Sequence, residues 1–311
     1  MKREPGEKTL LITMGDPEGI GPEIIKKALS TISIHSRVVI LGNRQYYDDD
    51  SIEFVEDLPG DLKSDISFLE VDPDGNDPSF MYVKKAVAIS LEGSAEAIVT
   101  APVSKGKWIG AGNRFMGHTD FLVRSSGSEN WAMFFWSELM KVALFTTHIP
   151  LSKVFTRIKK KNLIKFCRFI DSELFRLTGK KFDLLMSGIN PHSGETGTMG
   201  DEEEEEIRPA VNDLKKEMKI DGPFPPDTVF LKAGKRKDTV VISLYHDQGL
   251  IPFKLQNINC GVNMTLGLPF IRTSPDHGTA FDIAGKGIAD PGSMSEAIKL
   301  ADQLLRVKEQ D

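Results

Sequence analysis

The feature of this sequence that most constrains its fold is an alternation of short apolar runs, rich in β-branched residues, with longer amphipathic segments. The runs typical of strands are Thr9–Met14, Arg37–Leu41, Ile66–Val71, Glu96–Thr100, Lys141–Thr147, Phe182–Ser187 and Thr239–Tyr245. The segments typical of helices are Pro22–Ser30, Val83–Leu91, Lys161–Leu177, Glu202–Lys216 and Ser293–Lys308. This alternation predicts an α/β fold with mostly parallel strands.

The composition is that of a globular protein with a large core, because 40% of its 311 residues are hydrophobic. No apolar run reaches the roughly 18 residues that cross a bilayer, and the segment Met1–Lys8 is charged where a secretion signal would be apolar. We therefore expect no membrane partner and a cytoplasmic location. A net charge of −6 opposes a general nucleic-acid binder, which normally carries a basic surface.

The cysteines and the acidic run are weak indicators of a metal site. Cys167 lies in an expected helix and Cys260 in a segment rich in Gly and Asn, and their spacing predicts reduced thiols rather than a disulfide or a sulfur-rich site. The acidic run Asp201–Glu206 most simply places negative charge on the first turn of a helix, where the backbone dipole favours it. A carboxylate metal site is the alternative interpretation of this run.

Three histidines, His148, His192 and His246, each lie at or just beyond the end of a predicted strand. In an open α/β sheet the ligands bind outside the carboxyl ends of the strands, so side chains from different strands can converge there. Three imidazoles leave open positions on a divalent cation for substrate oxygens, as a catalytic site requires. Any one of these histidines alone also suits a core or loop role, but the repeated position favours a shared metal site.

Asp247 directly follows His246 and allows several roles. Its carboxylate could orient the neighbouring imidazole, ligate the metal or act as a general base. The Asp-Gln pair that it begins is also an ordinary turn sequence.

Phosphate recognition has two candidate locations. One is the segment Gly117–Asp120, and the other is the stretch that holds Lys254, Asn263 and Arg272. A phosphate monoester requires charge-assisted donors, which lysine supplies as a point charge and arginine as a two-pronged fork. The alternative is that Lys254 and Arg272 are solvated surface residues.

Two glycine-rich segments are candidates for close contact with a ligand. Thr13–Glu23 joins a predicted strand to a predicted helix, but its spacing is neither the dinucleotide fingerprint nor a P-loop, so a structural turn fits equally well. Asp276–Pro291 is too long for a simple turn, and its Asp282 could accept hydrogen bonds from ribose hydroxyls. A purely structural loop is the alternative for this second segment.

Taken together, these segments resemble the 4-hydroxythreonine-4-phosphate dehydrogenase family of pyridoxal phosphate biosynthesis. The resemblance runs from about Leu10 to Ile298. The segments that carry it, in the family's order, are Thr13–Glu23, Gly117–Asp120, Thr147-His148, Asn190–Glu195, Pro225–Thr228, Tyr245–Gly249 and Asp276–Thr279.

The resemblance implies a role for each candidate residue. His148, His192 and His246 are expected to bind one divalent metal, zinc, magnesium or cobalt, at a site completed across a homodimer interface. The expected substrate-binding residues are His118, Thr119, Lys254, Asn263 and Arg272. Asp247 is the candidate for the residue that takes the first proton.

The loop from His277 to Pro291 also resembles the adenosine-binding loop of the isopropylmalate and isocitrate dehydrogenases. The expected cofactor-binding residues are His277, Gly278, Thr279, Asp282 and Gly285. The Asp282 carboxylate would repel a 2′-phosphate, so the expected cofactor is NAD. Asp290 stands where those dehydrogenases usually have Asn, so the resemblance does not extend to this position.

The resemblance further implies two α/β domains around a cleft, of the isocitrate/isopropylmalate dehydrogenase type. Residues 1–124 and 260–311 would form the domain that carries the NAD loop, and residues 125–259 the domain with the metal ligands and dimer interface. The expected reaction is oxidation of 4-phosphooxy-L-threonine at C3, followed by decarboxylation to 3-amino-2-oxopropyl phosphate. The alternatives are D-erythronate or D-threonate 4-phosphate as the substrate and, from another class, a phosphate acyltransferase of related fold.

Overall fold

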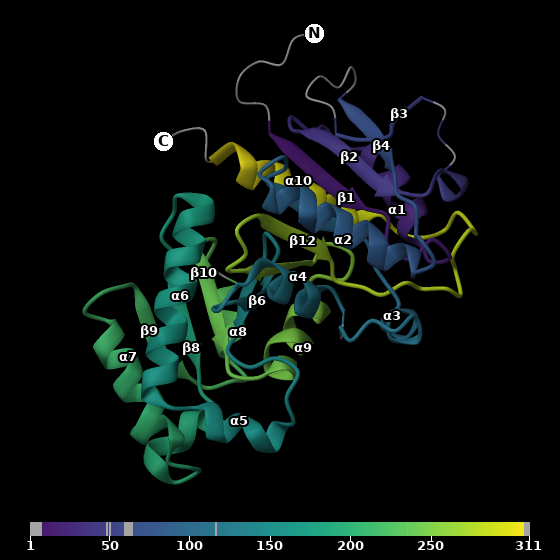
Figure 1. Ribbon diagram of the computed structural model, residues 1–311. Coiled ribbons are helices and arrows are strands. Elements are labelled where there is room, and N and C mark those ends of the chain that lie inside the picture. The colour runs from purple at the N-terminus through teal and green to yellow at the C-terminus, as the bar shows by residue number, and fades with distance from the viewer. Residues whose placement is uncertain are drawn as a thin grey trace. The chain divides into compact units, whose positions relative to one another are not determined.

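The computed structural model describes residues 8–47, 49, 51–58, 65–115, 117–234 and 236–307 (Figure 1). By its internal contacts the chain divides into an end unit, Met1–Trp131 with Gly267–Asp311, and a middle unit, Ala132–Leu266. Both boundaries lie seven residues beyond the predicted ones, at 131 against 124 and at 267 against 260. Residues 1–7 of the charged N-terminal segment, and Lys308 of the last predicted helix, lie outside the described residues.

The sheet of the end unit has the strand order β3-β4-β2-β1-β5-β12. The bounds of these strands are β1 Thr9–Thr13, β2 Arg37–Gly42, β3 Glu53–Val55, β4 Ile66–Glu70, β5 Ala97–Thr100 and β12 Ile271–Pro275. Every pair in this order is parallel. All residues of β1, β2 and β5 are buried, as expected where helices cover both faces of a parallel sheet.

The helices of the end unit are α1 Gly21–Leu29, α2 Pro78–Leu91, α3 Lys105–Gly110, α4 His118–Ser126 and α10 Gly292–Val307, with a 3₁₀ turn η1 at Arg44–Tyr46. Helix α10 packs against β12, β5 and α1. Helix α2 begins five residues before the predicted start at Val83, because Asp77 caps it by accepting a 3.1 Å hydrogen bond from the Phe80 N–H. Proline at the first helical position suits this start.

The sheet of the middle unit has the order β11-β6-β7-β10-β8-β9. Its strands are β6 Ala132–Trp136, β7 Lys141–Leu144, β8 Asp183–Ser187, β9 Ile220–Phe224, β10 Thr239–Ser243 and β11 Val262–Leu266. The pairs β11–β6 and β6–β7 are antiparallel, whereas β7–β10, β10–β8 and β8–β9 are parallel. Parallel β7, β10 and β8 therefore end at the same edge of this sheet.

The helices of the middle unit are α5 Leu151–Arg157, α6 Lys160–Thr178, α7 Arg208–Leu214, α8 Val229–Ala233 and α9 His246–Gln256. A 3₁₀ segment η2 spans Pro191–Gly197, and a π-helical turn η3 spans Glu203–Ile207. The predicted helix Glu202–Lys216 is thus a π-helical turn followed by α7. Helix α9 packs on β7 and β10 over a buried cluster that includes Val142, Leu144 and Phe253.

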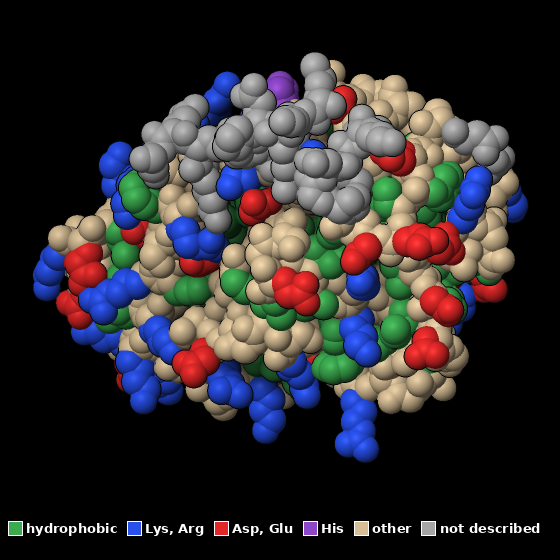
Figure 2. Space-filling model, turned by 45° about the horizontal axis from the view of Figure 1, so that its top comes forward, with side chains coloured by type: hydrophobic (Ala, Val, Ile, Leu, Met, Phe, Trp, Pro, Cys, Tyr) green, Lys and Arg blue, Asp and Glu red, His purple; other side chains and the backbone are tan. Residues whose placement is uncertain are grey.

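The predicted α/β class with mostly parallel strands is confirmed, and each predicted strand overlaps a strand of the structure. No helix in the described part of the chain is long and apolar enough to span a membrane. Basic and acidic side chains are both spread over the face drawn in Figure 2.

Candidate functional site

Two of the three predicted metal ligands lie together in the middle unit. His148 follows β7 and His246 is the first residue of α9 after β10, and their ring centroids are 5.5 Å apart. The segments that carry them are joined beyond the strand ends, because Thr146 Oγ1 donates a 2.7 Å hydrogen bond to the Leu244 carbonyl. Both rings are open to solvent at least in part, so they can accept a ligand from outside.

The His246 ring is oriented by its neighbour in sequence. Nδ1 of His246 lies 2.6 Å from Oδ1 of Asp247, whose side chain is largely exposed. A carboxylate on one ring nitrogen fixes the direction in which the other nitrogen points. This contact is the one that an orienting role of Asp247 requires.

Gln248 is a positioning residue that the sequence did not single out. It is buried, its Oε1 accepts a 2.6 Å hydrogen bond from the Leu244 N–H, and its Nε2 donates to the Gly188 carbonyl at 2.7 Å. This amide links the end of β10 to the end of β8, from which His192 follows. The only signal in the sequence is its place directly after His246-Asp247.

His192 does not join the other two histidines. Within the described ranges of this single chain, no group of three or more His, Cys, Asp or Glu side chains could hold a metal ion. His192 is exposed in the η2 segment, where it and Ser193, Glu195 and Thr196 all have positive φ. Such a run of left-handed residues persists only where surrounding contacts hold it.

Glu203 supplies those contacts. It is fully buried, its Oε1 accepts hydrogen bonds from the backbone N–H groups of Ile189 (2.7 Å) and Asn190 (2.8 Å), and its Oε2 accepts from Asn190 Nδ2 at 2.8 Å. Gly194 lies against it, so closely that a Cβ there would be 2.8 Å from Oε2. The acidic run lies on a first helical turn, as expected, and within it Glu203 also organises the segment that carries His192.

The predicted substrate residues His118, Thr119 and Arg272 belong to the end unit. Arg272, on β12, is 2% exposed, and its Nη2 donates a 2.8 Å hydrogen bond to Oγ1 of Thr100 at the end of β5. The alternative that Arg272 is a solvated surface residue is wrong. Burial lowers the pKa of this guanidinium to about 9, so it stays protonated at neutral pH.

His118 begins helix α4 and packs edge-on against the Trp108 ring at 5.5 Å. Burial, reinforced by the positive charges of Arg272 and Lys105, holds the pKa of His118 well below its usual value. Its buried Nε2 has no hydrogen-bond partner among the described residues. The end unit therefore holds a neutral imidazole with unused hydrogen-bonding capacity near a buried cation.

The other two predicted substrate residues belong to the middle unit. Lys254 is exposed on α9. Asn263 lies on β11, and its buried Oδ1 finds no partner in the part of the chain that the structure describes. A buried amide oxygen without a partner costs stability, and a ligand hydroxyl that donates to it would recover this cost.

The predicted cofactor loop presents bare backbone to solvent. A Cβ at Gly278, Gly285 or Gly287 would meet nothing within 4 Å, so a ligand can approach the main chain at these points. His277 and Asp282 are exposed on the same loop. These features fit a nucleoside that lies along the loop.

The glycine-rich turn Thr13–Glu23 is shaped by close packing. A Cβ at Gly21 would lie 2.1 Å from the Met14 carbonyl oxygen, and one at Gly19 would lie 3.0 Å from the Thr279 carbonyl oxygen. The Ile20 N–H donates to that same Thr279 oxygen at 3.0 Å. The turn thus packs against the start of the predicted cofactor loop at Thr279, so it has the structural role that was one of its two interpretations.

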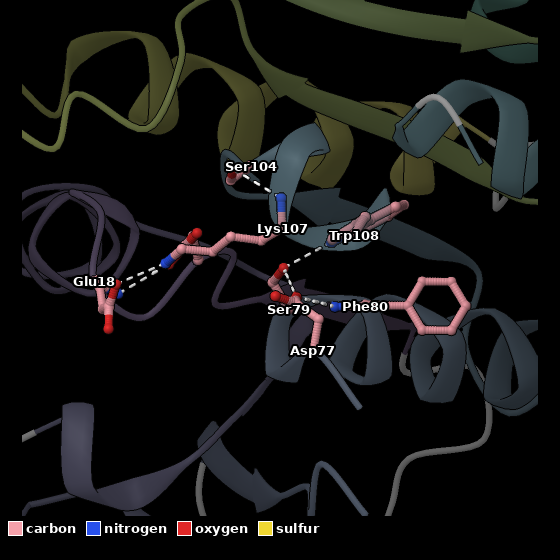
Figure 3. Close-up of polar contacts among 8 residues, drawn as sticks. Glu18, Asp77, Ser79, Phe80, Ser104, Lys107 and Trp108 are labelled. Atoms are coloured by element: carbon pink, nitrogen blue, oxygen red, sulfur yellow. Dashed lines mark hydrogen bonds and ion pairs between the residues drawn. The ribbon is translucent and has the colours of Figure 1, made fainter. Parts of the chain in front are cut away.

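Lys107 of α3 ties the same turn to its surroundings (Figure 3). Its Nζ donates to Asp16 Oδ1 at 2.9 Å and to Glu18 Oε2 at 2.7 Å, and lies 5.0 Å from the centroid of the Phe281 ring. Burial alone would lower the pKa of Lys107, but the hydrogen bonds to Glu18 and Asp16 outweigh it and raise this pKa. No motif in the sequence singled out Lys107.

Helix α3 itself is fixed to α2 by a short polar chain that Figure 3 shows. Trp108 Nε1 donates a 2.8 Å hydrogen bond to Ser79 Oγ, which donates in turn to Asp77 Oδ1 at 2.5 Å. Because Trp108 also packs on His118, this chain helps to set the position of the imidazole.

Comparison with known proteins gives one consistent result. The family model for the pyridoxal phosphate biosynthetic protein PdxA matches residues 13–301. A 4-hydroxythreonine-4-phosphate dehydrogenase from Sulfurihydrogenibium sp. is 40% identical, over 96% of this chain and 99% of its own. A D-threonate 4-phosphate dehydrogenase from Salmonella typhimurium is 38% identical over the same shares.

Solved structures agree with the sequence matches. The crystal structure of 4-hydroxythreonine-4-phosphate dehydrogenase from Klebsiella pneumoniae superposes with a TM-score of 0.82 and 36% identity, over 96% of this chain and 98% of that one. The family match covers most of the chain, and the relatives span its whole fold at well above chance identity. The chain therefore belongs to the PdxA family of pyridoxal phosphate biosynthetic proteins.

Proposed function

We propose that this protein oxidises the C3 hydroxyl of 4-phosphooxy-L-threonine, using NAD and one divalent metal ion. The keto acid then loses carbon dioxide to give 3-amino-2-oxopropyl phosphate. The observation that carries this proposal is the pair of imidazoles at the ends of β7 and β10, in a chain whose relatives are named for this reaction. Ligands of open α/β sheets bind beyond the carboxyl ends of the strands, and imidazole is a common ligand of divalent metals.

The residues that would hold the metal are His148, His192 and His246. A bound divalent cation would supply Lewis acidity to the substrate hydroxyl and carbonyl, whether it is zinc, magnesium or cobalt. Only two of the three imidazoles lie together in one chain, which supports a site completed across a homodimer interface. Glu203 and Gln248 hold the segments that present these ligands.

Phosphate binding is proposed for His118, Thr119 and Arg272, with Lys254 and Asn263. Arg272 brings a permanent charge that burial has already stripped of water, so its hydrogen bonds to a phosphate dianion would be strong. Neutral His118 can donate one further hydrogen bond without adding a charge. The partnerless Oδ1 of Asn263 is suited to a hydroxyl donor.

The chemistry requires a hydride acceptor and a base. NAD, on the loop that holds His277, Gly278, Thr279, Asp282 and Gly285, would accept the hydride from C3. The exposed Asp282 carboxylate favours NAD over NADP, because it would repel a 2′-phosphate. Asp247 is proposed to take the hydroxyl proton. When the bond to the carboxylate breaks, its electron pair stays on the substrate carbon, which is then protonated.

Asp247→Asn tests the assignment of the base. The amide cannot take a proton, so we expect kcat to fall by about a hundredfold or more and the acid limb of its pH profile to change. Steady-state kinetics between pH 6 and 9 measure both effects. Full turnover with an unshifted profile would remove Asp247 from this role.

A second substrate class is supported by the comparisons. The D-threonate 4-phosphate dehydrogenase of Salmonella typhimurium is nearly as similar to this chain as the threonine-ester enzymes. D-threonate and D-erythronate 4-phosphates share the phosphate and the hydroxyl that the proposed residues contact. A phosphate acyltransferase of related fold is a third interpretation, and it has no use for three metal-binding histidines.

NADH formation by the purified protein decides between these substrates. We would assay 4-phosphooxy-L-threonine, D-erythronate 4-phosphate and D-threonate 4-phosphate side by side, each with and without a chelator. Turnover of the threonine ester that the chelator abolishes supports the proposal in full. Turnover of a sugar-acid phosphate alone moves the protein to catabolism, and turnover of none overturns the proposed chemistry.

The proposed setting is the cytoplasm, with a small phosphorylated hydroxy acid and a second copy of the chain as partners. Neither nucleic acid nor a membrane is an expected partner. Stoichiometric metal in the purified protein would argue further against the acyltransferase interpretation.

A further inference from the structure

An ion pair on α1 faces the cofactor loop. Glu23 Oε1 and Lys27 Nζ are 2.8 Å apart, one helical turn from each other. Neither side chain is fully exposed, with 14% and 34% of their surfaces open to solvent. A surface pair of this kind contributes little by itself, so its further contacts decide what it does.

The pair binds the backbone of the loop on both its donor and its acceptor sides. Glu23 Oε1 accepts from the Ala289 N–H at 2.9 Å, and Oε2 accepts from the Gly287 N–H at 3.3 Å. Lys27 Nζ donates to the carbonyls of Gly287 at 2.9 Å and Ala289 at 2.8 Å. At both Gly287 and Ala289, Glu23 thus binds the backbone N–H and Lys27 binds the backbone carbonyl.

These contacts fix the C-terminal part of the loop, at Gly287 and Ala289. The N-terminal part is fixed separately, because the Thr279 carbonyl accepts a hydrogen bond from the Ile20 N–H. Residues 280–286, with Asp282, lie between the two anchors and form turns rather than a helix or strand. Within this span the Ile283 N–H donates to the Ala280 carbonyl and the Lys286 N–H to the Ile283 carbonyl. These bonds close local turns, so the two anchors are what tie the span to α1 and the turn before it.

We propose that Glu23 and Lys27 are positioning residues that hold the loop in its dinucleotide-binding conformation before the cofactor arrives. This inference rests on the proposed role of the loop in NAD binding. A loop that is already ordered loses less conformational entropy on binding, so its affinity is higher. Neither side chain needs to touch the cofactor for this effect.

Two substitutions break the clamp in different ways. Glu23→Gln places an amide N–H₂ against the backbone N–H groups, and Lys27→Met removes the two donations to carbonyls while keeping the length of the side chain. Lys27→Arg retains donors and is the conservative rescue. Glu296→Gln is the matched control, because Glu296 pairs with Lys299 on α10 of the same unit and does not contact the loop.

The first measurement is hydrogen exchange at the Gly287 and Ala289 amides in the full chain without cofactor. The second is the dissociation constant for NAD by direct titration, together with KM values for NAD and for the phosphorylated substrate. We expect Glu23→Gln and Lys27→Met to speed exchange and to raise the NAD dissociation constant about tenfold, the size of effect of a lost charge-assisted hydrogen bond. Substrate KM and thermal stability should match the Glu296→Gln control, and Lys27→Arg should restore NAD affinity.

The outcomes separate this inference from the proposed function. Faster exchange with unchanged NAD affinity would show that the pair orders the loop without any bearing on the cofactor, and unchanged exchange would show that the clamp does not hold the loop. If the wild-type chain does not bind NAD, the proposed cofactor fails and the purpose assigned to the clamp fails with it. Exchange alone still decides whether the clamp orders the loop.

Discussion

At the scale of single residues, burial determines the chemistry of the proposed phosphate site. On the surface, Arg272 would be an ordinary hydrated cation and His118 an ordinary titratable group. In the end unit, Arg272 is a dehydrated guanidinium and His118 is a neutral imidazole. The same burial that raises the energy of these groups would strengthen their hydrogen bonds to a bound anion.

The depressed pKa of His118 makes stability depend on pH. Below pH 6.5 the unfolded chain binds a proton at His118 that the folded chain does not bind, so the free energy of unfolding falls as the pH falls. The slope from this group approaches about 1.4 kcal/mol per pH unit until the folded pKa is reached. Urea unfolding of wild type and His118→Gln between pH 4.5 and 7.5 measures it. The difference between the two proteins should vary below pH 6.5 and be flat above it, and parallel curves throughout would contradict the prediction.

At the scale of elements, the proposed metal ligands are placed by close contacts between a helix or turn and the strand ends. Helix α9, which begins with His246, approaches β7 and β10 so closely that a Cβ at Gly249 would lie 2.8 Å from both Leu144 Cδ2 and Val142 Cγ1. The η2 segment with His192 is built around Glu203 in a comparable way. Both contacts are long-range, so neither is visible as a local pattern.

Gly249→Ala tests the packing of α9. Alanine favours the helix, but the added methyl group must push α9 away from the sheet, at a cost of about 1–3 kcal/mol. We expect a lower unfolding free energy and weaker metal binding, measured by denaturation and by metal titration. Gly110→Ala, in α3, is the control because its Cβ would meet nothing within 4 Å. It should be neutral or stabilise by about 0.5 kcal/mol, and equal effects of both changes would refute the packing argument.

Glu203→Gln tests the anchor of the η2 segment. An amide cannot accept all three hydrogen bonds that the carboxylate accepts, so we expect a loss of roughly 2–3 kcal/mol in unfolding free energy. Metal affinity should fall as well, because His192 loses its fixed place. Glu205→Gln changes an exposed member of the same acidic run and should leave both quantities unchanged. A Glu203→Gln protein with wild-type stability would show that the buried carboxylate is not the anchor.

At the scale of the whole molecule, the three proposed metal ligands all belong to the middle unit, yet only two of them lie together. A homodimer with two-fold symmetry can supply the missing imidazole to each site from the other protomer. If the site is shared in this way, variants that lack histidines from different protomers should complement each other in a mixed dimer.

Mixing inactive variants checks the shared site. In a mixed dimer of His192→Ala and His246→Ala, one of the two sites has all three histidines, so random reassociation should restore about a quarter of wild-type activity. His148→Ala mixed with His246→Ala is the control, because these two histidines serve the same side and should not complement each other. Activity after unfolding and refolding the mixtures together is the measurement. Restoration in both mixtures, or in neither, would contradict the proposed division of ligands.

The amino-acid sequence predicted the α/β class, seven of the strands, and the order of motifs that marks the family, because apolar runs and helix periodicity are local signals. It did not predict helix α9, whose 11 residues carry no strong periodicity. It also did not indicate that Glu203 and Gln248 are buried, or that Glu23 and Lys27 bind the loop at Gly287 and Ala289. Those facts depend on contacts between segments far apart in the chain, which only tertiary packing brings within hydrogen-bond distance.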